Sequence, residues 1–295
     1  MPSWPTGLHR SSTESGLPPA PGSFLTLDGN RVHAMLDGSA DADVAVVFES
    51  ALGCPCTEWA HVQRELAAQG IRSVAYDRPG IGWSPELPQP DQSRDHADRL
   101  FSLVRQLTSQ NVVLVGHSVG GLLSLLFWQA HPERVAALVL VDSSHPEQHV
   151  RSSRQREGLR GLREQLYRAR RRRTPVPYDG DVVNLPTPLG RLTHGSATSH
   201  TGTRAALREF EAWQALWAPD AAHVMSLGDL PLTVITAGDV VRRDPAHGVL
   251  QRELAALSRN ARHVVIDGAT HQGLVMRPEH AARVAAEIIN LVRKR

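Results

Sequence analysis

Short continuous apolar runs alternate along the chain with longer stretches in which apolar residues recur at helical spacing. Continuous apolar runs are typical of strands buried on both faces of a parallel sheet, and the helical spacing is typical of amphipathic helices. The alternation therefore predicts an α/β fold with a mostly parallel central sheet flanked by helices. We expect about eight strands, at Phe24–Leu27, Arg31–Leu36, Val44–Phe48, Ile71–Tyr76, Val112–Val115, Ala136–Val141, Leu232–Ala237 and His263–Ile266.

The first two strands are expected to differ from the rest. Only Asp28-Gly29-Asn30 separates them, which predicts a tight turn and an antiparallel hairpin. Between the later runs the apolar spacing predicts helices at Glu58–Gln69, Gln92–Thr108, Ser118–Ala130 and Pro278–Arg293.

The alternation is interrupted once, after the sixth predicted strand. Residues 145–228 show no strand pattern, while Leu159, Leu162 and Leu166 lie at helical spacing and a second helix is expected over Arg204–Trp217. We predict a helical cap over residues 145–228, inserted into a core made of residues 23–144 and 229–295, with a flexible extension at residues 1–22. Because ligands bind at the carboxyl ends of parallel strands, such a cap would help to shape the pocket.

The segment Gly116-His117-Ser118-Val119-Gly120 joins a predicted strand to a predicted helix. Small residues at both ends of a G-x-S-x-G segment allow a sharp turn that presents the serine hydroxyl above the sheet. A serine hydroxyl becomes a good nucleophile only when a base takes its proton and an acid orients that base. Ser118 is therefore the candidate nucleophile.

The base and the acid are expected where later strands end. His271 follows the last predicted strand, within Asp267-Gly268-Ala269-Thr270-His271, and is the candidate base. Asp142 directly follows the sixth strand and is the first choice for the acid. Asp239, after the next strand, is the alternative, and Asp244 lies further along what we expect to be the same loop.

Two backbone amides are expected to bind the developing oxyanion. The amide of Val119 directly follows the nucleophile at the start of a helix. The second amide is assigned to Leu52, in the small-residue loop Ser50-Ala51-Leu52-Gly53 after the third strand.

These motifs together resemble the α/β-hydrolase superfamily. The order of nucleophile, acid and base matches that family, and Asp77–Ser84 is similar to its D-x-x-G-x-G-x-S loop. Two positions depart from the family pattern. Ser50-Ala51 stands where His-Gly is usual, and Val241 stands where the family commonly has its acid.

The resemblance implies a hydrolase for a carboxylic ester or similar acyl compound, working through an acyl-enzyme without a metal or an organic cofactor. The alternatives are C–C bond hydrolysis or perhydrolysis by the same triad, or a catalytically silent binding module on this fold. A serine at the elbow disfavours haloalkane dehalogenases and epoxide hydrolases of this fold, which use aspartate there.

Composition and charge add few constraints. The net charge of +2 gives no reason to expect nucleic acid or a membrane as partner, and no apolar run approaches the ~20 residues of a membrane span. Residues 1–22 lack the apolar region of a secretory signal. Cys54 and Cys56 are too few for a zinc site built on cysteine pairs and too close for a good disulfide. We therefore expect a reduced, cytoplasmic protein with a small-molecule substrate and leave its oligomeric state open.

One segment has a strong charge bias. Arg151–Arg173 contains ten arginines and two glutamates. We interpret it as a solvated face of the cap with leucines packed inward, the alternatives being recruitment of an anionic substrate or contact with a partner surface.

Overall fold

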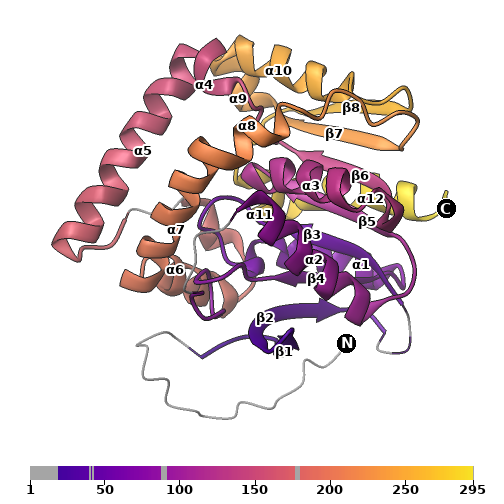
Figure 1. Ribbon diagram of the computed structural model, residues 1–295, viewed down its shortest axis with the longest axis horizontal. Coiled ribbons are helices and arrows are strands. Elements are labelled where there is room, and N and C mark those ends of the chain that lie inside the picture. Colours follow the sequence, from indigo (N-terminus) through magenta and orange to yellow (C-terminus); the bar gives the residue numbers. More distant parts are fainter. Residues whose placement is uncertain (1–18, 40, 42, 88–91, 177–179, 295) are drawn as a thin grey trace.

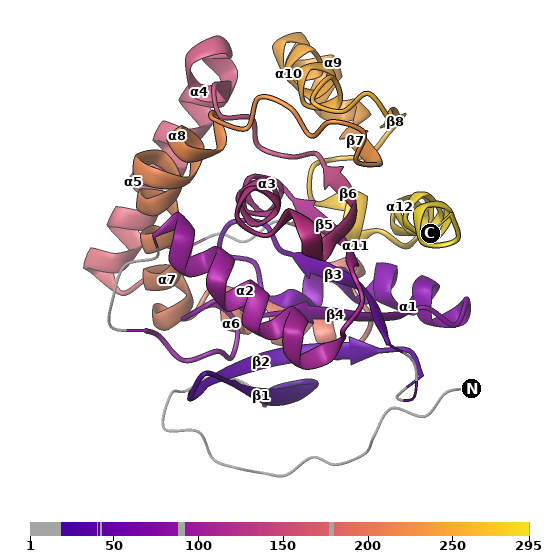
Figure 2. The same cartoon turned by 45° about the vertical axis from the view of Figure 1, so that its right-hand side comes forward.

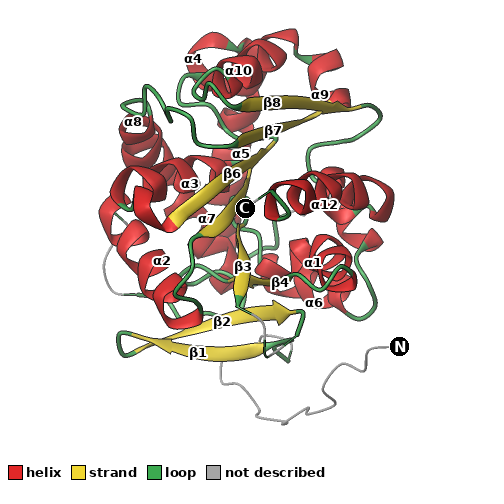
Figure 3. Ribbon diagram, turned by 90° about the vertical axis from the view of Figure 1, so that its right-hand side faces the viewer, coloured by secondary structure: helices red, strands yellow, loops and turns green. Residues whose placement is uncertain are grey.

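The computed structural model describes residues 19–39, 41, 43–87, 92–176 and 180–294. Its core is one eight-stranded sheet in the order β1-β2-β4-β3-β5-β6-β7-β8 (Figure 3). The strands are β1 (Ser23–Leu27), β2 (Asn30–Asp37), β3 (Val44–Glu49), β4 (Arg72–Tyr76), β5 (Val112–His117), β6 (Val135–Val141), β7 (Leu232–Ala237) and β8 (Ala261–Ile266). The hairpin β1–β2 and the pair β2–β4 are antiparallel, and the other neighbours are parallel. The predicted fold class and all eight predicted strands are confirmed, whereas residues 1–18 of the predicted extension lie outside the described residues.

Helices cover both faces of the sheet (Figure 2). Those of the core are α1 (Ala60–Ala68), α2 (Ser93–Leu107), α3 (Val119–Ala130), α9 (Gly238–Arg243), α10 (Pro245–Ala255), α11 (Gly273–Met276) and α12 (Pro278–Val292), with 3₁₀ turns η1 (Cys56–Trp59) and η2 (Pro132–Arg134). Apolar residues of α1, α11 and α12 form one core cluster with the sheet. Apolar residues of α2, α3 and α10 form another on the opposite face.

The central strands show why their sequences are continuously apolar. In β3, Val46 and Phe48 belong to the cluster of α1 and α12, while Val47 belongs to the cluster of α2 and α3. Because successive side chains point to opposite faces and both faces are covered, neither face of these strands needs polar residues.

The segment between β6 and β7 is helical. Its elements are α4 (Gln148–Arg151), α5 (Ser153–Arg172), η3 (Gly180–Asn184), α6 (Leu189–Ala197), α7 (His200–Ala212), the π-helical turn η4 (Trp213–Trp217) and α8 (Ala218–Ala221). We call these elements the inserted segment. Figure 1 shows α5 and α7 side by side at one side of the molecule. The predicted boundaries of the cap, 145 and 228, stay a prediction.

Apolar side chains attach the inserted segment to α3. Leu166, Phe210 and Trp217 are buried in one cluster with Leu122 and Leu126 of that helix. On α5 the arginines near the carboxyl end, residues 170–172, are exposed. A solvated arginine face over an inward apolar stripe is the arrangement expected for Arg151–Arg173.

The region after β7 differs from the sequence prediction. Asp239 and Asp244 do not share a loop, because Asp239 lies in α9 and Asp244 is the N-cap of α10, with Pro245 as the first helical residue. Proline is favoured at that position because the first helical N–H has no acceptor in the helix.

No helix in the described ranges is long and apolar enough to cross a membrane.

Candidate active site

Ser118 lies at a strained turn between β5 and α3. Its backbone has φ 57° and ψ −122°, a region that residues with a side chain rarely adopt. The neighbouring glycines make the turn feasible, because a Cβ on Gly116 would lie 2.4 Å from the carbonyl oxygen of Gly120, and one on Gly120 would lie 2.4 Å from that of Glu49. The turn is fixed at its base by a hydrogen bond from the Ser118 amide to the Val141 carbonyl, 3.1 Å.

His271 lies on the loop between β8 and α11, and its Nδ1 is 2.6 Å from Oδ2 of Asp142. The Asp142 carboxylate is fully buried, whereas the His271 side chain is 37% exposed. Ser118, His271 and Asp142 all line one cavity. The loop of His271 is held from below, because Nε2 of His117 donates to the His271 carbonyl at 3.2 Å.

The other two candidate acids have different partners. Asp239 forms an ion pair with Arg242 on its own helix, 2.6 Å. Asp244 accepts a hydrogen bond from the Ser152 hydroxyl, 2.6 Å. Of the three aspartates that the sequence left open, Asp142 is the one that contacts His271.

Asp142 has two further partners, on its other oxygen. Oδ1 accepts hydrogen bonds from Nε2 of His247, 2.8 Å, and from the Ala237 amide, 2.9 Å. Burial alone would raise the pKa of Asp142, but the hydrogen bonds from His247 and His271 outweigh it and hold that pKa far below its usual range. Asp142 is therefore an anion between two imidazoles. Sequence reasoning missed His247, since nothing in the pattern of α10 distinguishes it among 15 histidines.

The loop of the predicted oxyanion residue Leu52 is held by two buried carboxylates. The Ala51 amide donates to Glu58 and the Gly53 amide donates to Glu209, both at 2.8 Å. Leu52 lies between these anchored amides and lines the cavity. Val119, the other predicted oxyanion residue, is the first residue of α3, so its amide has no acceptor within the helix.

Arg78 fixes the same loop by binding two of the loop's backbone carbonyl groups. Its guanidinium donates to the carbonyls of Ser50, 2.7 Å, and Ala51, 2.8 Å. It also binds both carboxylate oxygens of Glu209, 2.5 and 2.9 Å. Burial opposes the charged form, but Glu209 and then Glu49 outweigh it and raise the pKa of Arg78 above its usual range. Glu209 comes from α7, so the inserted segment takes part in shaping the predicted oxyanion loop.

The cavity has a volume of about 1080 Å³ and lies between the sheet and the inserted segment. Apolar side chains from that segment, including Leu159, Leu162 and Trp213, form part of its wall. Arg154 and Arg243 also line it, are exposed, and form no ion pair within the described part of the chain. Trp213 thus contributes both to the cavity wall and to the packing on α3.

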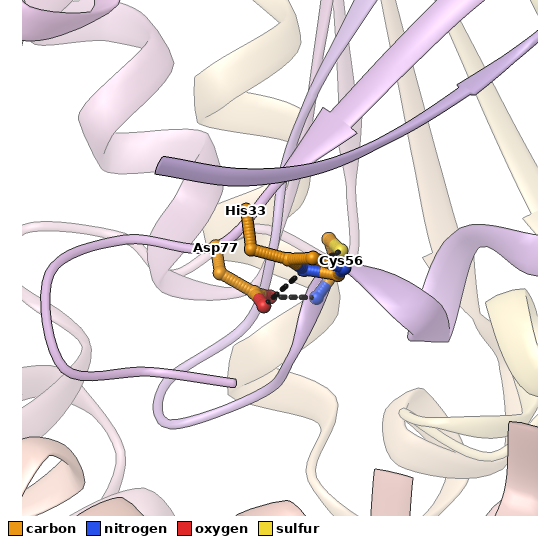
Figure 4. A group of neighbouring side chains, drawn as sticks. All are labelled: His33, Cys56 and Asp77. Atoms are coloured by element: carbon orange, nitrogen blue, oxygen red, sulfur yellow. Dashed lines mark hydrogen bonds and ion pairs between the residues drawn. The ribbon is translucent and has the colours of Figure 1, made fainter. Parts of the chain in front are cut away.

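A second buried cluster, His33, Cys56 and Asp77, has the residue types of a metal site (Figure 4). Nδ1 of His33 contacts Asp77 Oδ2 at 2.7 Å, and its Nε2 donates to the Pro21 carbonyl. The Asp77 oxygens also accept the amides of Cys56, 2.7 Å, and Trp83, 2.9 Å.

The chemistry of this cluster does not fit a metal. Burial lowers the pKa of His33, but Asp77 and the Pro21 carbonyl outweigh it and raise that pKa. Both ring nitrogens face oxygen acceptors, so neither offers a lone pair to a metal. Burial and Asp77 raise the pKa of the Cys56 thiol well above its usual value, whereas metals bind the thiolate. The cluster is a hydrogen-bonded ion pair that joins β2 to the turn after β4.

Comparisons with known proteins agree with this architecture. The model of the α/β-hydrolase fold family matches residues 44–185. An esterase from Exiguobacterium antarcticum superposes with a TM-score of 0.69 at 17% identity, over 92% of this chain and 99% of that one. The chain has the α/β-hydrolase fold, and residues 44–185 match the model of that family.

Curated relatives match over part of the chain. A protein of Variovorax paradoxus, provisionally named carbamate hydrolase RutD, is 34% identical over 120 residues, which are 40% of this chain and 45% of the relative. The 2-hydroxy-6-oxononadienedioate/2-hydroxy-6-oxononatrienedioate hydrolase of Escherichia coli is 33% identical over 142 residues, 47% of this chain and 48% of the relative. The chain thus matches about half the length of these relatives.

Proposed function

We propose that this α/β-hydrolase cleaves a carboxylic ester or a similar acyl compound, with Ser118 as nucleophile, His271 as base and Asp142 as the acid that orients it. The observation that carries the proposal is the joint placement of three features in one cavity. Ser118 occupies a strained elbow, and His271 is held through Nδ1 by a buried carboxylate at 2.6 Å. An imidazole oriented in this way by a carboxylate can act as a general base.

The reaction follows from these roles. Ser118 Oγ attacks the substrate carbonyl while His271 takes its proton, and the positive charge on the imidazole is balanced by Asp142. His271 then gives the proton to the departing alcohol, which leaves an acyl group on Ser118. A water molecule, deprotonated by His271, releases the acid by the reverse transfers.

Backbone amides of Leu52 and Val119 would bind the oxyanion that forms in each step. Their geometry is fixed before substrate arrives. Glu58 and Glu209 hold the amides on either side of Leu52, and Arg78 holds two carbonyls of the same loop. Fixed donors need little reorganisation as charge develops. The same network explains how Ser50-Ala51 can replace the family's His-Gly, since the oxyanion is bound by backbone rather than by side chains.

A second candidate is hydrolysis of a C–C bond in a substrate that carries a further carboxylate. Two observations favour it. Arg154 and Arg243 give the cavity two cations without an ion pair in the described residues. One relative is named as a hydrolase of dioates. A small anionic molecule would suit either chemistry, whereas neither proposal involves nucleic acid. The cytoplasmic location stays a prediction, consistent with two buried free cysteines.

The test is labelling of the purified protein with a fluorophosphonate, read by intact mass. We expect one adduct on the natural chain, none on Ser118→Ala, and a much slower reaction of His271→Ala. Side-by-side assays with p-nitrophenyl esters and with a vinylogous diketone acid then separate ester from C–C bond hydrolysis. If a control serine hydrolase is labelled and this chain is not, the proposal is wrong and the fold serves as a binding module.

A further inference from the structure

His247 is the residue near the candidate triad that the reaction above does not use. It lies in α10, is 5% exposed, and places Nε2 2.8 Å from Asp142 Oδ1. Its Nδ1 lies 2.9 Å from Nε2 of Gln155, on α5 of the inserted segment. The residues therefore form a chain from α5 through His247 to Asp142 and on to His271.

Each contact of His247 has a defined direction. The carboxylate of Asp142 can only accept, so His247 Nε2 donates, and the Gln155 amide nitrogen can only donate, so Nδ1 accepts. A single tautomer, with its proton on Nε2, satisfies both bonds. The ring is thus held at both ends and cannot turn without losing a hydrogen bond in a buried place, where an unmet bond is costly.

The direction of the Asp142 carboxylate depends on this ring. A carboxylate held by one donor can rotate about its terminal torsion, which has broad minima. Here Oδ1 is fixed by His247 and by the Ala237 amide, which leaves Oδ2 aimed at His271. Asp142 itself has φ 42°, so its backbone is also held in an unusual conformation.

We propose that His247 is a positioning residue for the triad acid, and that through Gln155 it makes the geometry of Asp142 depend on where α5 lies. The inference rests on the proposed function, because it assigns a second task around the same acid. Gln155 lines the cavity together with Arg154, Gly158 and Leu159 of α5. A substrate that shifts this face of α5 would therefore alter the orientation of Asp142 through two hydrogen bonds, Gln155 to His247 and His247 to Asp142.

The first test compares His247→Leu with His247→Gln. Leucine removes the donor to Asp142, whereas the glutamine amide can put a donor near the place of Nε2. The readout is the fluorophosphonate reaction, split into its saturating rate constant and its half-saturating concentration. Because a hydrogen bond to a charged group is lost, we expect the saturating rate constant to fall by about 10-fold to 100-fold in His247→Leu. The half-saturating concentration should be unchanged, and His247→Gln should recover to within about 3-fold of the natural chain.

A second test addresses the link to α5 and does not rely on substitution of the buried ring. Gln155→Met removes the donor to Nδ1 with little change in size, and we expect about a 3-fold to 10-fold slower saturating rate constant. This effect should vanish in the His247→Leu background, where leucine offers no acceptor to Gln155. Gln165→Met is the matched control, since Gln165 is an exposed glutamine of the same helix that does not line the cavity.

The outcomes separate the two proposals. If the natural chain is not labelled, the proposed function fails and the inference fails with it. If the natural chain is labelled, the inference is overturned when His247→Leu keeps the natural rate constant or when His247→Gln is as slow as His247→Leu. The coupling to α5 is overturned when Gln165→Met slows the reaction as much as Gln155→Met or when Gln155→Met keeps its effect in the His247→Leu background.

Discussion

Asp77 and Asp142 each follow the carboxyl end of a parallel strand, β4 and β6, and each is about 1% exposed. Each contacts a histidine Nδ1, at 2.7 Å for His33 and 2.6 Å for His271, and each accepts at least one backbone amide. The two pairs differ in the surroundings of the other ring nitrogen, Nε2, of the histidine. The ring of His33 is fully buried and its Nε2 donates to a carbonyl, whereas the ring of His271 is 37% exposed and lines a cavity with Ser118.

The two sites show that an aspartate–histidine pair is not in itself a catalytic feature. Because both nitrogens of His33 face acceptors and its pKa is raised, its surroundings favour the imidazolium over transfer of its proton. With one nitrogen bound to Asp142 and the ring at a cavity wall, His271 is suited to take a proton and give it back. The surroundings of the second nitrogen decide which role the pair can play.

Substitution of Asp142 should give the largest effect on reactivity. Asp142→Asn offers an amide where His271 needs an acceptor, and we expect the fluorophosphonate reaction to slow by about four orders of magnitude. Asp239→Asn is the matched control, because Asp239 also lines the cavity but pairs with Arg242. It should stay within about 3-fold of the natural rate. The reverse ranking of the two variants would transfer the role of acid to Asp239.

Substitution of Asp77 should instead act on stability. Asp77→Asn leaves the buried His33 cation without its partner, so the free energy of unfolding in urea should fall by about 3 kcal/mol. Labelling of Ser118 should persist at temperatures where the variant is still folded, as judged by circular dichroism. A folded Asp77→Asn protein that has lost its labelling would place Asp77 in the reaction and end the contrast between the two sites.

The charge on His33 should give a smaller, pH-dependent effect. The pKa of His33 is raised on folding, so its contribution to stability is complete below the unfolded pKa near 6.5 and is lost as pH rises through the folded pKa. His33→Gln keeps a neutral donor but no charge. Urea unfolding between about pH 5 and pH 9 should show a difference of about 1–2 kcal/mol at the acidic end that shrinks as pH rises. A difference that grows with pH would mean that His33 is neutral in the folded protein.

The sequence predicted the sheet well because central strands that are buried on both faces consist of continuous apolar runs. All eight apolar runs correspond to strands, and the chain after Val141 continues in helices. The helices α9 and α10 were missed, since their short sequences carry no clear apolar stripe. This omission mattered, because it placed Asp239 and Asp244 on one loop.

The candidate site was predictable only where it is local in sequence. Ser118 and Val119 belong to one strand-turn-helix motif, and His271 follows a strand end. The choice among three aspartates depends on side-chain direction, which a sequence does not give. His247 is 105 positions from Asp142, and Glu209 is 131 positions from Arg78, so these contacts exist only once distant parts of the chain have packed together.

Glu209 has a consequence for protein engineering. Exchanging the covering helices of a hydrolase for those of a relative is an obvious way to transplant a new substrate range onto an existing core. In this chain the graft would remove the carboxylate that binds the buried guanidinium of Arg78 and the amide of Gly53. The host would keep a buried cation beside its predicted oxyanion loop that has lost its two-oxygen partner and pairs with Glu49 at 3.3 Å. A chimera of this protein must therefore bring its own acidic residue to the place of Glu209.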